Sequence, residues 1–529
     1  MIIRSSIRCV GSGRLLVYRP RVLQAKQCRY SSSTSSLASS AGSTSPASML
    51  GPFTNELDRI TPKFQLRGSQ ISVLRSPSEF YETLKGKILG AENRIFLSTL
   101  YIGKSEHELV ITSTTLQKAL RAKPKLKLSI LTDALRGTRE SPEASCASLL
   151  APLISEFGAD RVEIRMYHTP NLTGLRKKYI PKRINEGWGL QHMKLYGVDD
   201  EFIISGANLS NDYFTDRQDR YLVFSSREIT EYFSKIHNAV AGISFLVTPN
   251  SQLQAGYTLE WPSSNLAPSP LDAPGRYISQ ASTLLKTLIQ PSAIPQKTID
   301  PQLNTTVYPV SQFTPLLIPD SSTELPAITT ILKTLSAPEF STSSWTFTAG
   351  YFNPHPSLTT LLLSTASKDN TVITASPWAN GFYGSKGVSG LLPAAYTLLS
   401  RRFLEAAQKA GRQADVVLKE WRNGTVGEKG GWTYHAKGLW VSLNGEKDPS
   451  ITVVGSSNYT KRSYGLDLEV GTVIVTSDDG LKRRLGEERD GLGKFAGQVG
   501  MDEFISVERR VGIRVRIAMW IVKIVGGAL

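Results

Sequence analysis

Two short stretches decide the fold of this chain: QHMKLYGVDD at Gln191–Asp200 and YHAKGLWVSL at Tyr434–Leu443. Each reads as a β-strand, and each carries the pattern His-x-Lys. The four residues of the two patterns are His192, Lys194, His435 and Lys437. Residues i and i+2 of a strand point to the same face, so each His–Lys pair can reach into one site.

The sequence on both sides of these stretches is repeated in the same order. The matched blocks are Leu97–Gly103 with Thr346–Asn353, Leu128–Leu135 with Thr371–Asn380, Val162–His168 with Val416–Asn423, and Ile203–Phe224 with Val453–Ile474. Within them, apolar strand-like runs alternate with helix-length amphipathic segments, which indicates an α/β fold. We therefore predict two tandem α/β repeats that pack pseudo-symmetrically around one active site.

The duplication predicts a division of the chain. We expect the first repeat at 70–247 and the second at 326–500. The Pro- and Ser-rich stretch 248–325 is predicted to be a linker with one helix near Arg276–Leu288. Residues 507–529 mix apolar and basic side chains, which predicts an amphipathic segment on an anionic membrane surface. A helix packed on the protein's own core is the alternative for this last segment.

The amino-terminal segment 1–48 has the composition of a targeting sequence. It is rich in Arg and Ser, has no acidic residue, and lacks the uninterrupted apolar core of a secretory signal. These features are typical of a mitochondrial transit peptide followed by a disordered Ser-rich stretch. We expect a mitochondrial protein that lies peripherally on the inner membrane.

Charge and cysteine usage narrow the functional classes. The 529 residues include 61 Lys+Arg and 45 Asp+Glu, a net charge of +16, which suits phosphates, anionic lipid or nucleic acid without choosing among them. Three cysteines are too few for a disulfide scaffold or a Cys-based zinc site. The sequence carries no signal for an oligomeric state.

A second apolar run follows each His-x-Lys and ends in a turn of small residues and an asparagine. The asparagines are Asn208 and Asn458, and Ser456 lies in the second turn. An acidic residue, Asp219 or Glu469, follows each asparagine at the same distance along the chain. This equal spacing supports the alignment of the two repeats.

Side chains of these types can transfer a phosphoryl group. A neutral imidazole can attack phosphorus while a second imidazolium protonates the leaving oxygen. Lysine and asparagine side chains, here with Ser456, can hold the phosphoryl oxygens. An acid that accepts a hydrogen bond from the other ring nitrogen fixes the tautomer, the role we predict for Asp219 and Glu469. We expect no metal and no cofactor.

The set resembles the phospholipase D superfamily, whose members carry two His-x-Lys-x4-Asp motifs. The first copy is complete and ends at Asp199, whereas the second has Ser442 where an Asp is expected. By this resemblance Asp199 joins the two histidines and two lysines in the catalytic set, although in the family it mainly supports the fold.

Six sequence segments resemble one branch of this superfamily, the eukaryotic mitochondrial phosphatidyltransferases. They are LSTLYIG, GLQHMKLYGVDD, ISGANLSNDYFTDRQDRY, TAGYFNP, SPWANGF and YHAKGLW. The resemblance implies transfer of a phosphatidyl group from CDP-diacylglycerol to sn-glycerol-3-phosphate, giving phosphatidylglycerophosphate and CMP. It implies a phosphatidyl-histidine on His192, with His435 as acid and base; the reverse assignment stays open.

Other functions remain alternatives at this point. A mitochondrial nucleic-acid phosphodiesterase of the same superfamily would fit Ser442, but Asp199 and the phrases of the first repeat argue against it, so no nucleic-acid partner is expected. Cardiolipin or phosphatidylserine synthesis would use the same chemistry with another acceptor. A non-catalytic scaffold is disfavoured because both histidines and both lysines are present.

Overall fold

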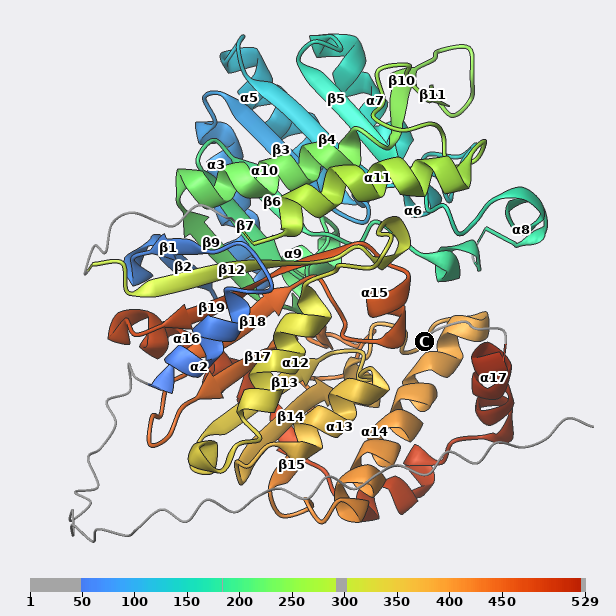
Figure 1. Cartoon of the computed structure of the whole chain (residues 1–529). Helices are drawn as coiled ribbons and strands as arrows, with labels where there is room; N and C mark the ends of the chain where they lie inside the picture. The colour runs from blue at the N-terminus through green and yellow to red at the C-terminus, as the bar shows by residue number, and fades with distance from the viewer. Residues whose placement is uncertain (1–48, 183, 292–301, 525–529) are drawn as a thin grey trace, which may run out of the picture. The chain divides into compact units, whose positions relative to one another are not determined.

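The structure is a computed structural model that describes residues 49–182, 184–291 and 302–524. The predicted transit peptide at 1–48 lies outside the described residues. Two nine-stranded sheets form the centre of the described part, with helices on their faces (Figure 1).

Seven strands of each sheet follow one order. In the first sheet they are β5 (Val162–Tyr167), β4 (Lys127–Asp133), β3 (Arg94–Ser98), β6 (Leu195–Val198), β7 (Glu201–Ser205), β9 (Tyr221–Ser225) and β2 (Ile71–Leu74). In the second they are β15 (Val416–Trp421), β14 (Asp369–Ala375), β13 (Ser344–Ala349), β17 (Lys437–Ser442), β18 (Ile451–Gly455), β19 (Glu469–Thr476) and β12 (Thr305–Gln312). The first three strands of each order are parallel and the others antiparallel, so the predicted duplicated α/β fold is confirmed.

The stretch 248–325 is more than the linker with one helix that the sequence predicted. It does contain a helix, α11 (Pro274–Ile289). It also supplies β11 (Tyr257–Glu260), next to β10 (Phe245–Pro249) in the first sheet, and β12 in the second. The Pro- and Ser-rich composition of the stretch hid this strand, and its own Pro309 is a residue that argues against a strand in sequence.

Short strands complete both sheets. β1 (Phe64–Leu66) pairs with β12, and β20 (Ala496–Gln498) pairs with β15. Residues before the predicted start of the first repeat therefore join the second sheet. Helix α2 (Gly51–Leu57) belongs there too, since Phe53 and Leu57 lie in the same hydrophobic cluster as α12 (Glu324–Thr334).

The apolar core is made of clusters in which helices pack against the sheets. One cluster joins the first sheet to α3 (Pro77–Gly90), α5 (Gln117–Ala122) and α7 (Cys146–Phe157). Another joins the second sheet to α12, α13 (Pro356–Ser364) and α14 (Leu392–Lys409). The third draws side chains from both sheets and from α10 (Arg227–Ala241), α11 and α16 (Asp479–Gly493), so the two repeats share one interior.

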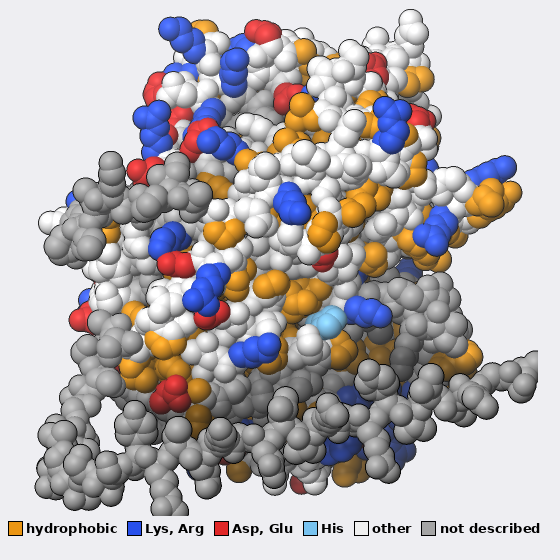
Figure 2. All heavy atoms as spheres, viewed as in Figure 1, with side chains coloured by type: hydrophobic (Ala, Val, Ile, Leu, Met, Phe, Trp, Pro, Cys, Tyr) orange, Lys and Arg blue, Asp and Glu red, His pale blue; other side chains and the backbone are white. Residues whose placement is uncertain are grey.

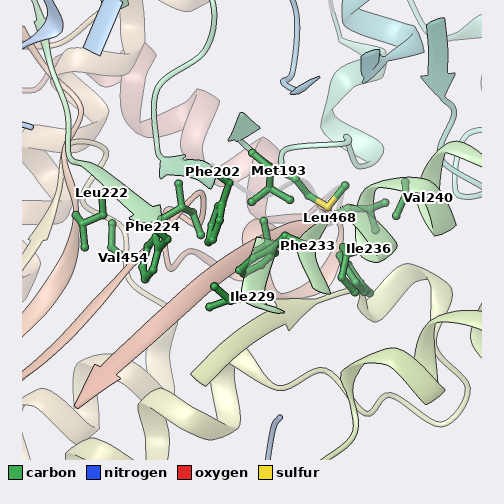
Figure 3. Packing of buried hydrophobic residues seen from close by; sticks show 14 of the residues in the cluster. Met193, Phe202, Leu222, Phe224, Ile229, Phe233, Ile236, Val240, Val454 and Leu468 are labelled. Carbon is green, nitrogen blue, oxygen red and sulfur yellow. The ribbon is translucent and has the colours of Figure 1, made fainter. Parts of the chain in front are cut away.

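The shared cluster reaches the residues next to the predicted site. Figure 3 shows Met193 and Leu468 among Phe202, Phe233 and Ile236. Met193 lies between His192 and Lys194, and Leu468 precedes Glu469, and both are fully buried. Burying a side chain of this size stabilises the fold by about 1.5–3 kcal/mol. The apolar neighbours thus fix the backbone that carries the polar residues.

A buried arginine ties the first repeat to the second. The Arg220 guanidinium donates to both carboxylate oxygens of Glu488 on α16, each at 2.8 Å, and to the Val453 carbonyl at 2.8 Å. It also lies 3.8 Å from the centroid of the Trp440 ring. Gly438 leaves room for it, because a Cβ there would lie 1.9 Å from the guanidinium. Arg220 follows Asp219 directly, so this anchor also positions a predicted site residue.

We predict that Glu488→Ala lowers the free energy of unfolding by about 3–5 kcal/mol, because it leaves the buried Arg220 charge unpaired. The measurement is urea unfolding of the purified protein followed by circular dichroism. Glu487→Ala is the matched control, since the Glu487–Arg75 ion pair is exposed and such pairs contribute about 0–1 kcal/mol. Equal losses in the two variants would contradict the anchoring role of Arg220.

Candidate active site

Each His-x-Lys segment pairs with the opposite repeat. The Leu468 amide donates to the Leu190 carbonyl at 2.8 Å, and the His192 amide donates to the Leu468 carbonyl at 2.9 Å. The second segment mirrors this: β16 (Thr433–Tyr434) runs parallel to β8 (Arg217–Gln218), and the His435 amide donates to the Gln218 carbonyl at 2.8 Å. The sequence predicted a β-strand through each His-x-Lys, but β6 begins at Leu195 and β17 at Lys437, so both histidines lie in the bridging segments that precede these strands.

Because the repeats are bridged in this way, each histidine pairs with the acid of the opposite repeat. His192 Nδ1 lies 2.9 Å from both carboxylate oxygens of Glu469, which belongs to the second repeat. His435 Nδ1 lies 2.6 Å from Oδ2 of Asp219, which belongs to the first. We assign the Nδ1 proton of each ring to the hydrogen bond with the acid of the other repeat, which leaves the lone pair on Nε2. Lys437 Nζ also lies 2.6 Å from His435 Nδ1. The sequence predicted the acids but not this exchange.

The Nε2 atoms of the two rings differ in their contacts. His435 Nε2 lies 3.2 Å from the hydroxyl of Tyr213, on the short helix α9 (Asn211–Thr215), and 3.2 Å from Lys437 Nζ. Within the part of the chain that the structure describes, no hydrogen bond engages His192 Nε2. His192 therefore has the free lone pair that attack on phosphorus requires.

Burial sets the charge of the site. It lowers the pKa of His192 and of His435 well below the usual range, and the adjacent Lys194 and Lys437 lower them further. Both rings are therefore neutral at pH 7. Burial also raises the pKa of Asp219, and that of Glu469 to about 7.

The two lysines are buried with the histidines. Lys194 Nζ donates to the His192 carbonyl at 2.6 Å, and Lys437 Nζ donates to the His435 carbonyl at 2.7 Å. Burial lowers the pKa of Lys194 to about 7 and that of Lys437 to about 8. Lys194 also interacts electrostatically with Lys437, Glu469 and Asp219, so the six residues form one cluster.

The predicted phosphate ligands lie beside this cluster but differ in their contacts. The side-chain oxygens of Asn208 and Asn458 are buried without a hydrogen-bond partner in the described residues. Ser456 is instead engaged, since its hydroxyl donates to Glu469 at 2.5 Å and accepts from the Val470 amide at 3.1 Å. Its contacts make Ser456 a support for Glu469 rather than an open phosphate ligand.

Three relatives of this chain share one enzyme name. The CDP-diacylglycerol–glycerol-3-phosphate 3-phosphatidyltransferase of Saccharomyces cerevisiae is 44% identical over 485 residues, which cover 88% of this chain and 92% of the relative. The Schizosaccharomyces pombe enzyme of that name is 42% identical, with 82% and 90% covered. The human one, named as mitochondrial, is 34% identical, with 88% and 84% covered.

The chain belongs to this phosphatidyltransferase family. No protein-family model matches it. Its fold is similar to the crystal structure of phosphatidylserine synthase from Haemophilus influenzae, with a TM-score of 0.66 and 18% identity, covering 90% of this chain and 97% of the other. That similarity is one of fold alone.

Asp199 does not join the cluster in this member of the phosphatidyltransferase family. It follows β6, at the opposite end of that strand from Lys194, and its carboxylate accepts from the amides of Glu92, Asn93 and Arg94 at 2.8–3.0 Å. It has a φ of 49° in the turn to β7. The prediction that Asp199 is catalytic is therefore corrected: it holds the start of β3.

Within the described residues, no group of three or more His, Cys, Asp or Glu side chains could hold a metal ion.

Two tyrosines at the site of this phosphatidyltransferase were not predicted from the sequence. The rings of Tyr213 and Tyr351 pack edge-on against His435, with centroid distances of 5.1 and 5.4 Å. Tyr213 has no tyrosine counterpart in the second repeat, where Ser463 stands at the matching position. A comparison of the two repeats for differences could have found it.

We predict that oxyanion binding to this phosphatidyltransferase weakens as pH rises. Lysine is charged below its pKa, so the free site loses charge through about pH 7 and about pH 8. Affinity for tungstate, whose charge is constant in this range, should fall by up to about tenfold per pH unit for each lysine. Calorimetric titrations of the wild type and Lys437→Met test this. A flat or rising affinity up to about pH 9 would contradict the assigned lysine pKa values.

Proposed function

We propose that this chain transfers the phosphatidyl group of CDP-diacylglycerol to sn-glycerol-3-phosphate and releases CMP, through a phosphatidyl-histidine intermediate. The relatives at 34–44% identity are named for this donor and acceptor, which favours glycerol-3-phosphate over serine or phosphatidylglycerol. The observation that carries the mechanism is the crossed pair of neutral histidines with one open Nε2.

In the first step, His192 Nε2 attacks the lipid-linked phosphorus and the bond to the CMP oxygen breaks. The Nδ1 proton stays on the ring, where Glu469 stabilises the positive charge that develops. The negative charge of the bound diphosphate favours protonation of His435, which donates its Nε2 proton to the departing CMP. Lys194 and Lys437 neutralise the charge that grows on the phosphoryl oxygens.

In the second step, the neutral His435 takes the proton of the glycerol-3-phosphate hydroxyl. The hydroxyl oxygen forms the new bond to phosphorus, and the bond to His192 breaks with its electron pair returning to Nε2. The side-chain NH₂ groups of Asn208 and Asn458 can hold the phosphoryl oxygens in both steps. That of Asn208 lies 3.4 Å from the Tyr213 hydroxyl, which contacts His435. The result is phosphatidylglycerophosphate and a regenerated enzyme.

We predict that His192→Ala abolishes transfer and that His435→Ala retains slow formation of the covalent adduct. Loss of the nucleophile removes the pathway, whereas general acid catalysis contributes about 10²–10⁴-fold. CDP-diacylglycerol labelled in the lipid-linked phosphate is mixed with each variant without acceptor, and the reaction is quenched in base, where phosphohistidine survives.

Label should remain on the wild type and on the surface control His355→Ala, and be absent from His192→Ala. Label on His192→Ala but not on His435→Ala would reverse the two roles. Steady turnover of the wild type without any trapped label would refute the intermediate.

We also propose that the chain is a mitochondrial protein held peripherally on the inner membrane, with 1–48 as its transit peptide. In the described residues, no helix is long and apolar enough to cross a membrane. The predicted tail at 507–529 is helical at α17 (Ile513–Ile524), where Ile513, Ile517 and Trp520 share one face and are 74%, 51% and 64% exposed. Val515 is buried, and α17 contacts α14.

A second exposed segment supports the membrane proposal. Helix α8 (Gly174–Tyr179) projects from the first repeat, and Figure 2 shows hydrophobic and basic side chains together at this tip. Leu175 and Tyr179 are 73% and 69% exposed beside basic residues of the same helix. Exposed apolar side chains among cations suit an anionic lipid surface.

We predict that the double variant Ile517→Glu, Trp520→Glu lowers binding to anionic vesicles at least about tenfold, because two apolar side chains worth about 1.5–3 kcal/mol each no longer insert. Flotation with vesicles of phosphatidylglycerol and phosphatidylcholine measures the bound fraction. Leu253→Glu, in the exposed loop between β10 and β11, is the control and should bind as the wild type does. Unchanged flotation of the double variant would overturn the role of α17.

A further inference from the structure

His435 lies in an aromatic enclosure that His192 lacks. The rings of Tyr213 and Tyr351 meet the His435 imidazole edge-on, at interplanar angles of 79° and 80°. Only 4% of His435 is exposed. Among the described residues, no aromatic ring packs against His192. The asymmetry falls on the histidine to which the proposed function assigns proton transfer.

Tyr213 is held firmly in its place. The Arg217 guanidinium lies 4.7 Å from the centroid of the Tyr213 ring, and it is itself fixed by Asp212 at 2.8 Å and by the Thr433 hydroxyl at 2.9 Å. The Asn208 amide donates to the Tyr213 hydroxyl at 3.4 Å. With His435 in its neutral form, the Tyr213 hydroxyl donates to Nε2 at 3.2 Å and, together with Lys437 Nζ at 3.2 Å, occupies the atom that would accept a proton.

Tyr351 closes the enclosure from the second repeat. Its ring stacks on Tyr396 with a centroid distance of 5.4 Å and contacts Phe382 at 5.5 Å. Gly381 allows this packing, because a Cβ there would lie 2.9 Å from the Tyr351 hydroxyl and 2.8 Å from the Arg217 guanidinium. Residues of both repeats thus keep the enclosure rigid around His435.

A phosphatidyl-histidine faces two competing acceptors. In the wasteful reaction, water forms a bond to phosphorus, the bond to His192 Nε2 breaks, the water proton passes to His435 Nε2, and phosphatidate is released. In the productive reaction the glycerol-3-phosphate hydroxyl takes the place of water. Both acceptors need His435 Nε2 as the base.

We propose that the Tyr213 hydroxyl is a positioning group that keeps water from His435 Nε2. It thereby directs the phosphatidyl-histidine to its alcohol acceptor. This inference rests on the proposed function. Water must displace the Tyr213 hydroxyl with no binding energy beyond one hydrogen bond. Glycerol-3-phosphate is anchored by its own phosphate, so its hydroxyl reaches His435 at a high effective concentration and displaces the tyrosine.

The test compares Tyr213→Phe with Tyr396→Phe in the full-length protein. The control removes a hydroxyl from the same aromatic group, and no hydrogen bond engages the Tyr396 hydroxyl in the described residues. The readout is the ratio of phosphatidate to phosphatidylglycerophosphate from labelled CDP-diacylglycerol and glycerol-3-phosphate. Tyr213→Phe should raise this ratio about fivefold or more, as loss of one neutral hydrogen bond of ordinary strength predicts, and Tyr396→Phe should leave it at the wild-type value.

A second measurement omits the acceptor. The wild type should release one equivalent of CMP in a burst and then turn over slowly, whereas Tyr213→Phe should continue to release CMP at a rate raised by a similar factor. An unchanged ratio and an unchanged rate after the burst would overturn the inference, as would an equal rise in Tyr396→Phe. Absence of phosphatidylglycerophosphate from the wild type with both substrates would instead refute the proposed function.

Discussion

The crossed hydrogen bonds between the repeats are the constraint on which the rest of the structure depends. Glu469 of the second repeat holds His192 of the first, and Asp219 of the first holds His435 of the second. Neither repeat contains a complete histidine–acid pair. The shared core, the short bridges between the repeats and the anchor formed by Arg220 all keep these two contacts in register. A duplicated unit thereby becomes a single site.

The same burial that orders the site also sets its chemistry. Removal from water disfavours charge, so the histidines are neutral and the lysines are close to losing their protons at physiological pH. Without substrate, this site destabilises the folded protein, because its buried charges are only partly compensated. An anionic substrate supplies the missing charge, so binding restores the charged state of the lysines at the moment when they are needed.

Small departures from the two-fold symmetry give the two histidines different environments. Tyr213 has Ser463 as its counterpart, and Gly206 has Ser456. A side chain at Gly206 would lie 2.7 Å from Asp219, whereas the Ser456 hydroxyl supports the longer Glu469. Tyr213 covers Nε2 of His435, whereas no hydrogen bond engages Nε2 of His192 in the described residues. Symmetry provides two imidazoles, and the departures from it give them different roles.

The sequence alone determined the duplication, the α/β class and the residues of the cluster, because strand alternation and equal spacing are local properties that a repeat displays twice. It missed the strand β12 in the Pro- and Ser-rich stretch, and it placed Asp199 in the catalytic set. Only the tertiary structure decided that the acids exchange partners and that Tyr213 covers one imidazole. Those contacts join residues more than two hundred positions apart, and their partners are fixed by packing between the repeats, which no local pattern encodes.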